Sequence, residues 1–336
     1  MSTCYVNAML NPLVTDIGPS MWKRVKGLEL HADSERCHEA INELLDKTVL
    51  SGGKRLRPLL TYVMGEFLQV DLEKLETPAR SIEMVHAASL SHDDVIDQAT
   101  QRRGNPSINV AASNKKAVLA GDYLLASVIV ELTKTGNLEL VKEMSHVIQD
   151  LAKGEWLQSD ASQDRLYSHD ILEKIAAYKT ASVMSWCCVA PGIIAGYNEN
   201  TLKQLRLFGH ELGIGFQLVD DVLDFSGTSQ KDQQLDLKNG IVNSVIYEWL
   251  LLNPVIHEQF NNGIDIYELW NEKRSSTGLD KAVAIVSNKA SEKLSNCHRI
   301  LDELSFDLSA TNDSNDIAKK RKPVEAIIKF LEKRNI

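Results

Sequence analysis

Residues 86–103 read HAASLSHDDVIDQATQRR, and they carry the strongest signal in the chain. The acids of this stretch follow an Asp-Asp-x-x-Asp pattern, at Asp93, Asp94 and Asp97. Apolar residues recur at helical spacing before them, with Thr77 as a possible cap and Pro78 at the first helical position. Because a helix turns by about 100° per residue, the first and last acids of the pattern share one face. The stretch therefore predicts a helix that ends in a cluster of carboxylates.

Such a cluster favours a bound cation. Three carboxylates on one face repel one another, raise one another's pKa and cost stability unless a cation joins them. Hard oxygen ligands suit Mg²⁺, which usually takes one or two carboxylates and completes its shell with water and substrate phosphates. The neighbouring Arg102 and Arg103 would then hold phosphate oxygens in a bidentate manner. A solvated acidic helix face is the alternative explanation of one such motif alone.

A second copy of the acidic pattern lies in residues 215–225, which read GFQLVDDVLDF. Its acids are Asp220, Asp221 and Asp224, at the same spacing as in the first copy. This copy also ends a periodic apolar pattern, which stops at Ser226 and Gly227. Two helices that each carry the same acids at their C-terminal ends predict the two walls of one metal site. The repetition argues against a merely solvated face.

Two further segments have the character of anion-binding sites. Residues 51–58 read SGGKRLRP, in which two glycines let backbone amides approach an anion. Positive charge is added there by Lys54, Arg55 and Arg57. A basic surface loop is the alternative for this segment. Lys179 and Thr180 lie within an otherwise apolar helical pattern and could reach a phosphate, with a snorkelling surface lysine as the alternative.

The composition bounds the class of protein. The chain has 336 residues, 43% of them hydrophobic, and a formal net charge of -9. This is enough chain for a large core, and the acidic balance argues against nucleic acid as a partner. Five cysteines are an odd number without metal-ligand spacing, which favours a reducing compartment. Residues 1–20 lack the layout of a signal or transit peptide, and no apolar run reaches membrane-spanning length, so we expect a cytoplasmic protein.

Helical periodicity dominates the rest of the chain, and no stretch alternates with period two for long enough to predict a sheet. We therefore expect an all-α fold, with residues 1–20 as an irregular leader and residues 21–336 as a single large helical bundle. The polar residues 226–239 directly follow the second acidic motif and are placed to act as a lid. Pro323 is expected to begin a final helix. The basic run at 319–322 either makes a peripheral contact with anionic lipid headgroups or is a solvated linker.

With these motifs, residues 25–336 resemble the trans-isoprenyl diphosphate synthases, the polyprenyl synthetase family. The resemblance rests on the Gly-Gly-Lys-Arg-Leu-Arg-Pro segment, both acidic motifs, the Arg-Arg-Gly after the first, Lys179-Thr180 and Phe216-Gln217. It implies a fold of the isoprenoid synthase type with a central active-site cavity, usually as a homodimer. It also implies head-to-tail (1′-4) condensation of isopentenyl diphosphate with an allylic diphosphate, dependent on Mg²⁺ with Mn²⁺ as a substitute.

The resemblance also assigns roles residue by residue. The metal would be held by Asp93, Asp94, Asp97, Asp220, Asp221 and Asp224, chiefly through the first and last acid of each motif. The catalytic residues would be Asp93, Asp97, Lys179, Asp220 and Asp224. The allylic diphosphate would be bound by Arg102, Lys179, Thr180 and Gln217. Isopentenyl diphosphate would be bound by Lys54, Arg57, His86 and Arg103.

Product length is set in this family by side chains before the first motif, which block the cavity floor when they are aromatic. The corresponding residues here are small or slender: Ser81, Val85, Ala88 and Ser89. The resemblance therefore implies a long-chain all-trans polyprenyl diphosphate, of the type used for quinone side chains. The alternative is a short-chain product, geranylgeranyl or farnesyl diphosphate, if side chains of the facing helix block the floor. The candidates for such a block are Leu124, Leu125 and Val128.

The chain departs from the family pattern after the second motif. The family usually has a Gly-Lys-Pro loop before Asp-Leu, whereas Lys231 and Lys238 here flank a shorter Asp-Gln-Gln-Leu-Asp-Leu segment. The lysine of that loop that binds diphosphate is therefore unassigned. Two other classes compete with the synthase. A class I terpene cyclase normally lacks the basic glycine loop, and a non-catalytic subunit of a heteromeric synthase typically loses acids from its motifs.

Overall fold

The structure is a computed structural model of the chain, and it describes residues 13–31, 38–225, 237, 239–273, 278–309 and 313–334. Two compact units divide the chain. The amino-terminal unit comprises Ile17–Ile148 and Trp186–Leu202, and the carboxy-terminal unit comprises Met1–Asp16, Gln149–Ser185 and Lys203–Ile336. The single domain expected over residues 21–336 stays a prediction.

Helices make up most of the described residues, with almost no strand, so the all-α prediction is confirmed. The described part of the chain has one short hairpin, in which β1 (Gln101–Arg102) pairs antiparallel with β2 (Asn105–Pro106). Its two turn residues, Arg103 and Gly104, have φ angles of 54° and 82°. Positive φ at both central residues is what a two-residue turn of type I′ requires. The hairpin reverses the chain shortly after the first acidic motif.

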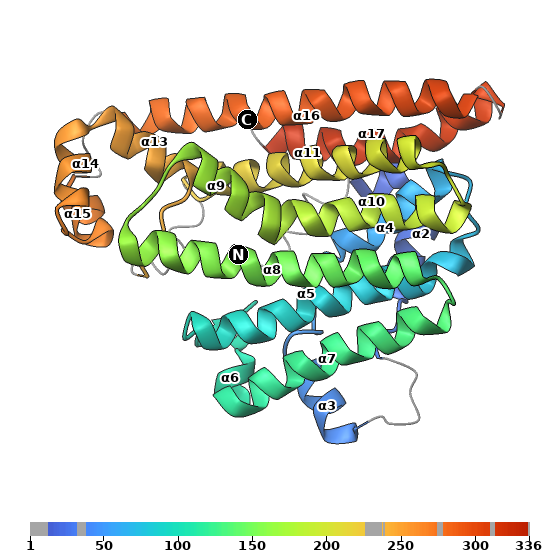
Figure 1. Cartoon of the computed structure of the whole chain (residues 1–336), viewed down its shortest axis with the longest axis horizontal. Coiled ribbons are helices and arrows are strands. Elements are labelled where there is room, and N and C mark those ends of the chain that lie inside the picture. The colour runs from blue at the N-terminus through green and yellow to red at the C-terminus, as the bar shows by residue number, and fades with distance from the viewer. Residues whose placement is uncertain are drawn as a thin grey trace. The chain divides into compact units, whose positions relative to one another are not determined.

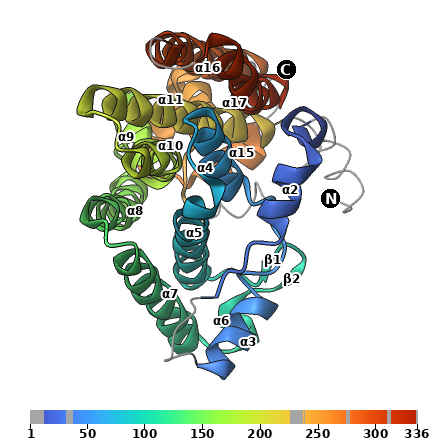
Figure 2. The same cartoon turned by 90° about the vertical axis from the view of Figure 1, so that its right-hand side faces the viewer.

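The amino-terminal unit is built around α5. Its elements are α2 (Pro19–Lys26), α3 (Glu39–Lys47), α4 (Leu56–Phe67), the 3₁₀ turn η1 (Leu72–Leu75), α5 (Glu76–Ile96), α6 (Ile108–Ala111) and α7 (Asn114–Lys134). Figure 1 and Figure 2 show α5 and α7 side by side, and α4 packs on α5 as well. Ile82 and Val85 of α5 and Val128 and Leu132 of α7 are fully buried. Burial of each such side chain stabilises the unit by about 1.5–3 kcal/mol.

The beginnings of two helices differ from the prediction. Residues 13–17, which fall in the expected irregular leader, are helical, and α2 begins at Pro19. α5 begins at Glu76, directly after η1. Asp71 caps η1, because its side chain accepts a hydrogen bond from the backbone N–H of Glu73 (3.1 Å). α5 itself has Leu75 at its N-cap and no side-chain cap, so Thr77 does not cap it.

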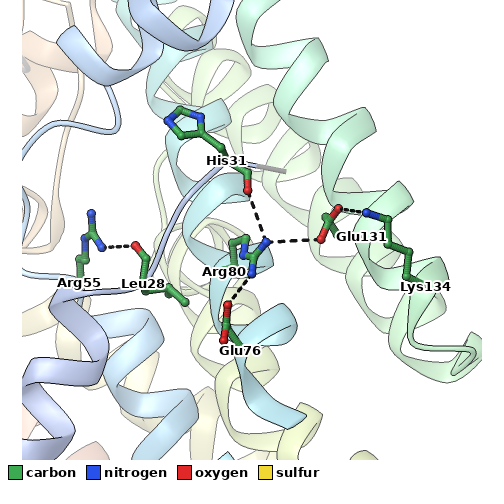
Figure 3. Close-up of polar contacts among 7 residues, drawn as sticks. All are labelled: Leu28, His31, Arg55, Glu76, Arg80, Glu131 and Lys134. Atoms are coloured by element: carbon green, nitrogen blue, oxygen red, sulfur yellow. Dashed lines mark hydrogen bonds and ion pairs between the residues drawn. The ribbon is translucent and has the colours of Figure 1, made fainter. Parts of the chain in front are cut away.

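An ion-pair cluster around the largely buried Arg80 and Glu131 lies beside residues 28–31 in the amino-terminal unit (Figure 3). Arg80 of α5 donates to Glu76 (2.7 Å) and to the backbone carbonyl of His31 (3.4 Å), and it lies 3.5 Å from Glu131 of α7. Lys134 donates to the same Glu131 carboxylate (2.7 Å). The side chains of Arg80 and Glu131 are only 12% and 6% exposed, so each needs the other's charge. The cluster ties α5 and α7 together at the start of α5, one helix length from the acidic motif.

The carboxy-terminal unit contains α9 (His169–Ala176), the π-helical turn η2 (Ala177–Ala181), α13 (Ser244–Leu252), α14 (Pro254–Asn261), α15 (Ile266–Lys273), α16 (Leu279–Ser309) and α17 (Ser314–Arg334). Figure 1 shows α17 along α16, with α14 and α15 beside the start of α16. Glu248 of α13 is buried and accepts hydrogen bonds from His169 of α9 (2.8 Å) and Lys289 of α16 (2.6 Å). These contacts fix α9, and the turn that follows it, in the unit.

Three long helices contain residues of both units: α8 (Leu138–Asp164), α10 (Ser182–Ala195) and α11 (Glu199–Leu223). The expectation that Pro323 begins the final helix is wrong, because α17 begins at Ser314 and contains Pro323. A proline removes one helical hydrogen bond, and the helix continues on both sides of it. Of the predicted lid over residues 226–239, only residues 237 and 239 lie within the described residues. Among the residues that the structure describes, no helix has the length and apolarity needed to cross a membrane.

Candidate active site

Each acidic motif lies at the C-terminal end of a helix, as predicted. Asp97 directly follows the last residue of α5, and Asp224 directly follows the last residue of α11. The backbone N–H of each last acid donates to the carbonyl of the first acid, Asp93 at 2.8 Å and Asp220 at 3.1 Å. The C-terminal end of a helix carries a partial negative charge, so acids there cost stability unless a cation compensates them.

The middle acid of the first motif is buried. Asp94 is 0% exposed, and its Oδ1 accepts a hydrogen bond from Nε of Arg102 (2.7 Å). Its Oδ2 accepts one from the backbone N–H of Ile108 (3.3 Å). Asp93 and Asp97 are partly exposed. Arg102, which was expected to contact the allylic diphosphate, therefore uses its Nε–H on Asp94.

The middle acid of the second motif is also buried, with different hydrogen-bond partners. Asp221 is 6% exposed, and its two oxygens accept hydrogen bonds from Nε2 of Gln217 (3.0 Å) and from the backbone N–H of Ser244 (3.0 Å). Burial raises the pKa of Asp221, and these hydrogen bonds oppose the shift. Oε1 of Gln217 accepts from the hydroxyl of Thr180 (2.8 Å). Thr180 and Gln217, both expected to bind the allylic diphosphate, thus form a chain of hydrogen bonds that ends on Asp221.

The acids fit a divalent metal, and their exposure differs within each motif. The first and last acid of each motif are partly exposed. Asp94 and Asp221 are buried and hydrogen-bonded to their own chain, and their role as metal ligands stays a prediction. The described residues contain no group of three Asp, Glu, His or Cys side chains that could hold a metal ion. Pairs of outward carboxylates suit Mg²⁺, which needs only one or two of them beside water and phosphate oxygens.

Asp220 has a cation beside it. Arg334, the last residue of α17, donates from Nη2 to Oδ1 of Asp220 (3.1 Å). The side chain of Arg334 is 16% exposed and that of Asp220 is 40% exposed. No sequence motif indicated this contact, because 114 residues separate the two positions.

The glycine loop makes room for Arg103. Gly53 has a φ of 81°, and a Cβ at this position would lie 2.9 Å from Nη1 of Arg103. The same Nη1 donates to the backbone carbonyl of Ser51 (2.8 Å). Arg55 instead donates to carbonyls near the end of α2, including that of Leu28 at 2.7 Å (Figure 3). The glycines therefore accommodate a cation, where the sequence predicted only the approach of an anion.

His86 lies among these cations. Desolvation lowers the pKa of His86 well below its usual value, and the charges of Arg57, Arg103 and Arg102 lower it further. Desolvation also lowers the pKa of Arg103; Glu83 opposes this shift, and Arg102 and Arg57 add to it. The imidazole of His86 is therefore neutral at pH 7. Because the surrounding positive charges disfavour one another, this cluster gains stability when an anion binds.

Glu83 is the acid of this cluster, and no sequence motif indicated it. It lies one helical turn before His86 on α5 and is buried. Burial raises the pKa of its carboxyl, and the charges of Arg57, Arg55 and Arg103 lower it. The sequence signal for Glu83 is an acid three residues before the histidine, in an otherwise apolar part of the helix.

Lys179 lies in the π-helical turn η2 and points toward α8. Its Nζ donates to the carboxylate of Glu155 and to Oε1 of Gln158 (3.1 Å). Gly154 permits this approach, because a Cβ there would lie 2.6 Å from Cγ of Lys179. π-helical turns are frequent at functional sites. A diphosphate would therefore compete with Glu155 for Lys179.

The predicted chain-length residues lie in the amino-terminal unit, on α5. Three of them are 0% exposed: Ser81, Val85 and Ala88. Ser89 is partly exposed, and its hydroxyl donates to the carbonyl of His86 (2.9 Å). Leu124 and Val128 of α7 are buried, and Leu125 is partly buried. None of these positions on α5 or α7 carries an aromatic side chain. The role of these residues in product length stays a prediction.

The candidate residues are divided between the two units. Asp93, Asp97 and the cations around His86 belong to the amino-terminal unit, whereas Asp220, Asp224 and Lys179 belong to the carboxy-terminal unit. Within each unit, the structure gathers its own part of the predicted site. That the two acidic motifs form opposite walls of one site stays a prediction.

Known proteins resemble this chain in sequence. Solanesyl-diphosphate synthase 1, mitochondrial, of Oryza sativa subsp. japonica is 35% identical over 266 residues, which are 72% of this chain and 62% of that protein. Heptaprenyl diphosphate synthase component 2 of Geobacillus stearothermophilus is 37% identical over 182 residues, which are 54% of this chain and 57% of the relative. The matches thus span less than two thirds of the length of either relative.

Solved structures resemble the fold. A crystal structure of polyprenyl synthase from Caulobacter crescentus CB15, complexed with calcium and isoprenyl diphosphate, has a TM-score of 0.74 at 24% identity, covering 97% of this chain and 98% of that one. The family model described as polyprenyl synthetase matches residues 38–286. The resemblance noted from the motifs is confirmed, and the chain belongs to the polyprenyl synthetase family.

Proposed function

We propose that the chain catalyses the Mg²⁺-dependent, head-to-tail (1′-4) condensation of isopentenyl diphosphate with an allylic diphosphate. The observation that carries this proposal is the gathering of Arg57, Arg102 and Arg103 around a neutral His86. Glu83 and Asp94 offset part of this positive charge, and a bound diphosphate would relieve the remaining repulsion. The cluster lies on and beside the helix that presents Asp93 and Asp97, so an anion site and a metal site adjoin.

Two outward acids of each motif would hold the metal: Asp93 with Asp97, and Asp220 with Asp224. The metal, when bound, supplies positive charge to the leaving diphosphate. Mn²⁺ is expected to substitute, because carboxylate and phosphate oxygens suit it as well. Arg334 would have to share or release Asp220 when a metal binds there.

The remaining steps divide among the basic side chains. Lys179 and Arg102 would offset the negative charge that develops on the allylic diphosphate as its carbon–oxygen bond breaks. Lys54, Arg57 and Arg103 would hold isopentenyl diphosphate with its double bond toward the allylic carbon, where the new carbon–carbon bond forms. Transfer of a proton from the isopentenyl unit to the departing diphosphate then restores a double bond.

We further propose that the product is a long-chain all-trans polyprenyl diphosphate, used for a quinone side chain. The small side chains of Ala88 and Ser89 support this proposal, because neither blocks a growing chain. The names of the rice and Geobacillus relatives, solanesyl and heptaprenyl diphosphate synthase, agree with it. A cytoplasmic location stays a prediction from the sequence.

A homodimer that uses the outer face of α7 is the proposed assembly. Val118, Leu119 and Val130 of this helix are exposed. Apolar side chains that gather on an exposed helix face favour a protein partner. A heteromeric partner is the alternative, because the Geobacillus relative is named as a component of its synthase. Analytical ultracentrifugation of the purified chain distinguishes a dimer from a monomer that awaits another subunit.

A product assay tests the activity. The purified chain is incubated with Mg²⁺, labelled isopentenyl diphosphate and farnesyl or geranylgeranyl diphosphate, and dephosphorylated products are sized by chromatography. We expect products well beyond geranylgeranyl length, and Asp220→Ala should lower turnover by orders of magnitude while circular dichroism stays unchanged. Products that stop at geranylgeranyl would overturn the long-chain proposal alone. A folded chain that makes no product would overturn the enzyme and favour the non-catalytic subunit.

A further inference from the structure

The middle acids of the two motifs occupy matching positions in their units. Oδ2 of Asp94 accepts a hydrogen bond from the backbone N–H of Ile108, the first residue of α6. Oδ2 of Asp221 accepts one from the backbone N–H of Ser244, the first residue of α13. Each acid is thereby tied to the start of a helix that lies 14 or 23 residues further along the chain.

The other oxygen of each middle acid is engaged as well. Oδ1 of Asp94 accepts from Nε of Arg102, and Oδ1 of Asp221 accepts from Nε2 of Gln217. Both side chains are at least nine-tenths buried, whereas the neighbouring acids of each motif are partly exposed. Two unrelated stretches of chain thus use the middle acid in the same way.

We propose that Asp94 and Asp221 are loop anchors, positioning residues that fix the return of the chain after each motif and do not ligate metal. Asp94 holds Arg102 and the hairpin that carries Arg103. Asp221 holds the chain at Ser244 and, through Gln217, the hydroxyl of Thr180. The contrast with metal ligands rests on the proposed function, whereas the anchoring contacts do not depend on it.

The donors around the two acids predict different responses to the same conservative substitution. Asp94 faces the Nε–H of Arg102 and the backbone N–H of Ile108, neither of which can become an acceptor. Asp94→Asn offers one acceptor and one N–H group, so one of these donors loses its partner. Asp221 faces Gln217, whose amide can rotate to present its oxygen. Asp221→Asn therefore keeps its contacts, and the Thr180 hydroxyl accepts where it now donates.

Hydrogen exchange measured by mass spectrometry tests the anchors directly. Asp94→Ala should raise exchange in peptides that cover the start of α6, and Asp221→Ala should raise it at the start of α13, while peptides from α16 serve as an internal reference. Asp221→Asn should restore protection at Ser244, and Asp94→Asn should not restore it at Ile108. Unchanged local exchange in both alanine variants, or equal rescue by asparagine at both positions, would overturn the inference.

Metal binding tests the second half of the proposal. Mn²⁺ bound per chain is counted by electron paramagnetic resonance in the presence of inorganic pyrophosphate, with Asp93→Asn and Asp220→Asn as matched controls. The controls should lose an ion or weaken its binding by about ten-fold or more, and Asp94→Asn and Asp221→Asn should keep the wild-type count. Loss of an ion from a middle-acid variant would make that acid a ligand. Absence of binding by the wild type would contradict the proposed function, and the exchange results would still decide the anchors.

Discussion

A methyl group at Gly213 would force α11 away from the turn that carries Lys179. A Cβ at this position would lie 2.4 Å from Cα of Ala181 and 2.9 Å from its Cβ. Neither atom can move by a change of rotamer, so the backbones themselves have to separate. Reaching an ordinary contact distance of 3.4 Å requires a separation of about 1 Å, a large shift for a close-packed interior.

Opposing contributions decide the size of the effect. Alanine is favoured over glycine in a helix interior by about 1 kcal/mol, whereas overpacking costs about 1–3 kcal/mol. The same separation stretches the hydrogen bond from Thr180 to Gln217, now 2.8 Å, beyond bonding range, at a cost of about 1 kcal/mol. We therefore expect Gly213→Ala to lower the free energy of unfolding by about 1–3 kcal/mol.

Gly215→Ala is the matched control on the same helix. The nearest atoms there are Cδ2 and Cγ of Leu294, at 3.1 and 3.2 Å, and this side chain can yield by a few tenths of an ångström. The control should be neutral or more stable by up to about 1 kcal/mol. Equilibrium unfolding in urea measures both variants. A Gly213→Ala protein as stable as Gly215→Ala would refute the close contact between α11 and η2.

Three further predictions concern buried side chains. Ala88→Phe places a ring where a fully buried methyl group now lies. If residue 88 forms the floor of the product cavity, the ring blocks the growing chain, and chromatography should find a shorter product. Products of unchanged length would contradict this role of residue 88. Burial raises the pKa of the Cys187 thiol to about 12. Mass spectrometry should therefore find Cys187 unmodified by iodoacetamide in the native protein and modified in urea. Labelling of Cys187 in the native protein would contradict its burial. Burial also raises the pKa of Glu83 in the folded protein. As the pH rises from about 4.5 through that raised pKa, the unfolded chain ionises this carboxyl more readily than the folded protein does. The free energy of unfolding of the wild type should therefore fall over this pH range. Urea unfolding at several pH values should show a flatter dependence for Glu83→Gln, and an identical dependence would show that Glu83 does not cause it.

Local features of the chain were predictable because their causes are local. Helical periodicity predicted a helix before each acidic motif, which α5 and α11 confirm, and it placed Asp97 and Asp224 at helix ends. The start of α5 was mistaken because a 3₁₀ turn with its own cap at Asp71 precedes the helix. Pro323 was mistaken for a helix start because a proline signals a boundary only on average, and contacts with α16 continue α17 across it.

The roles of single side chains within the motifs were not predictable in the same way. Helical spacing sets the first and last acids of each motif on one face, but nothing local shows which partners the middle acid has. The partners of Asp94 are Ile108 and Arg102, which the hairpin returns to α5. Glu83 and Arg334 were missed for a related reason, because their meaning depends on charges that other helices bring near them.

The sequence by itself determined the helical class, the two acidic motifs, the basic loop and the family. These follow from periodicity, spacing and residue type, which are properties of short stretches of chain. Only the tertiary structure decided which acids are buried and which are partly exposed, that Arg103 fills the space at Gly53, and that Arg334 pairs with Asp220. Burial and charge compensation depend on atoms that are distant in the chain and adjacent in space, so they are settled when the helices pack.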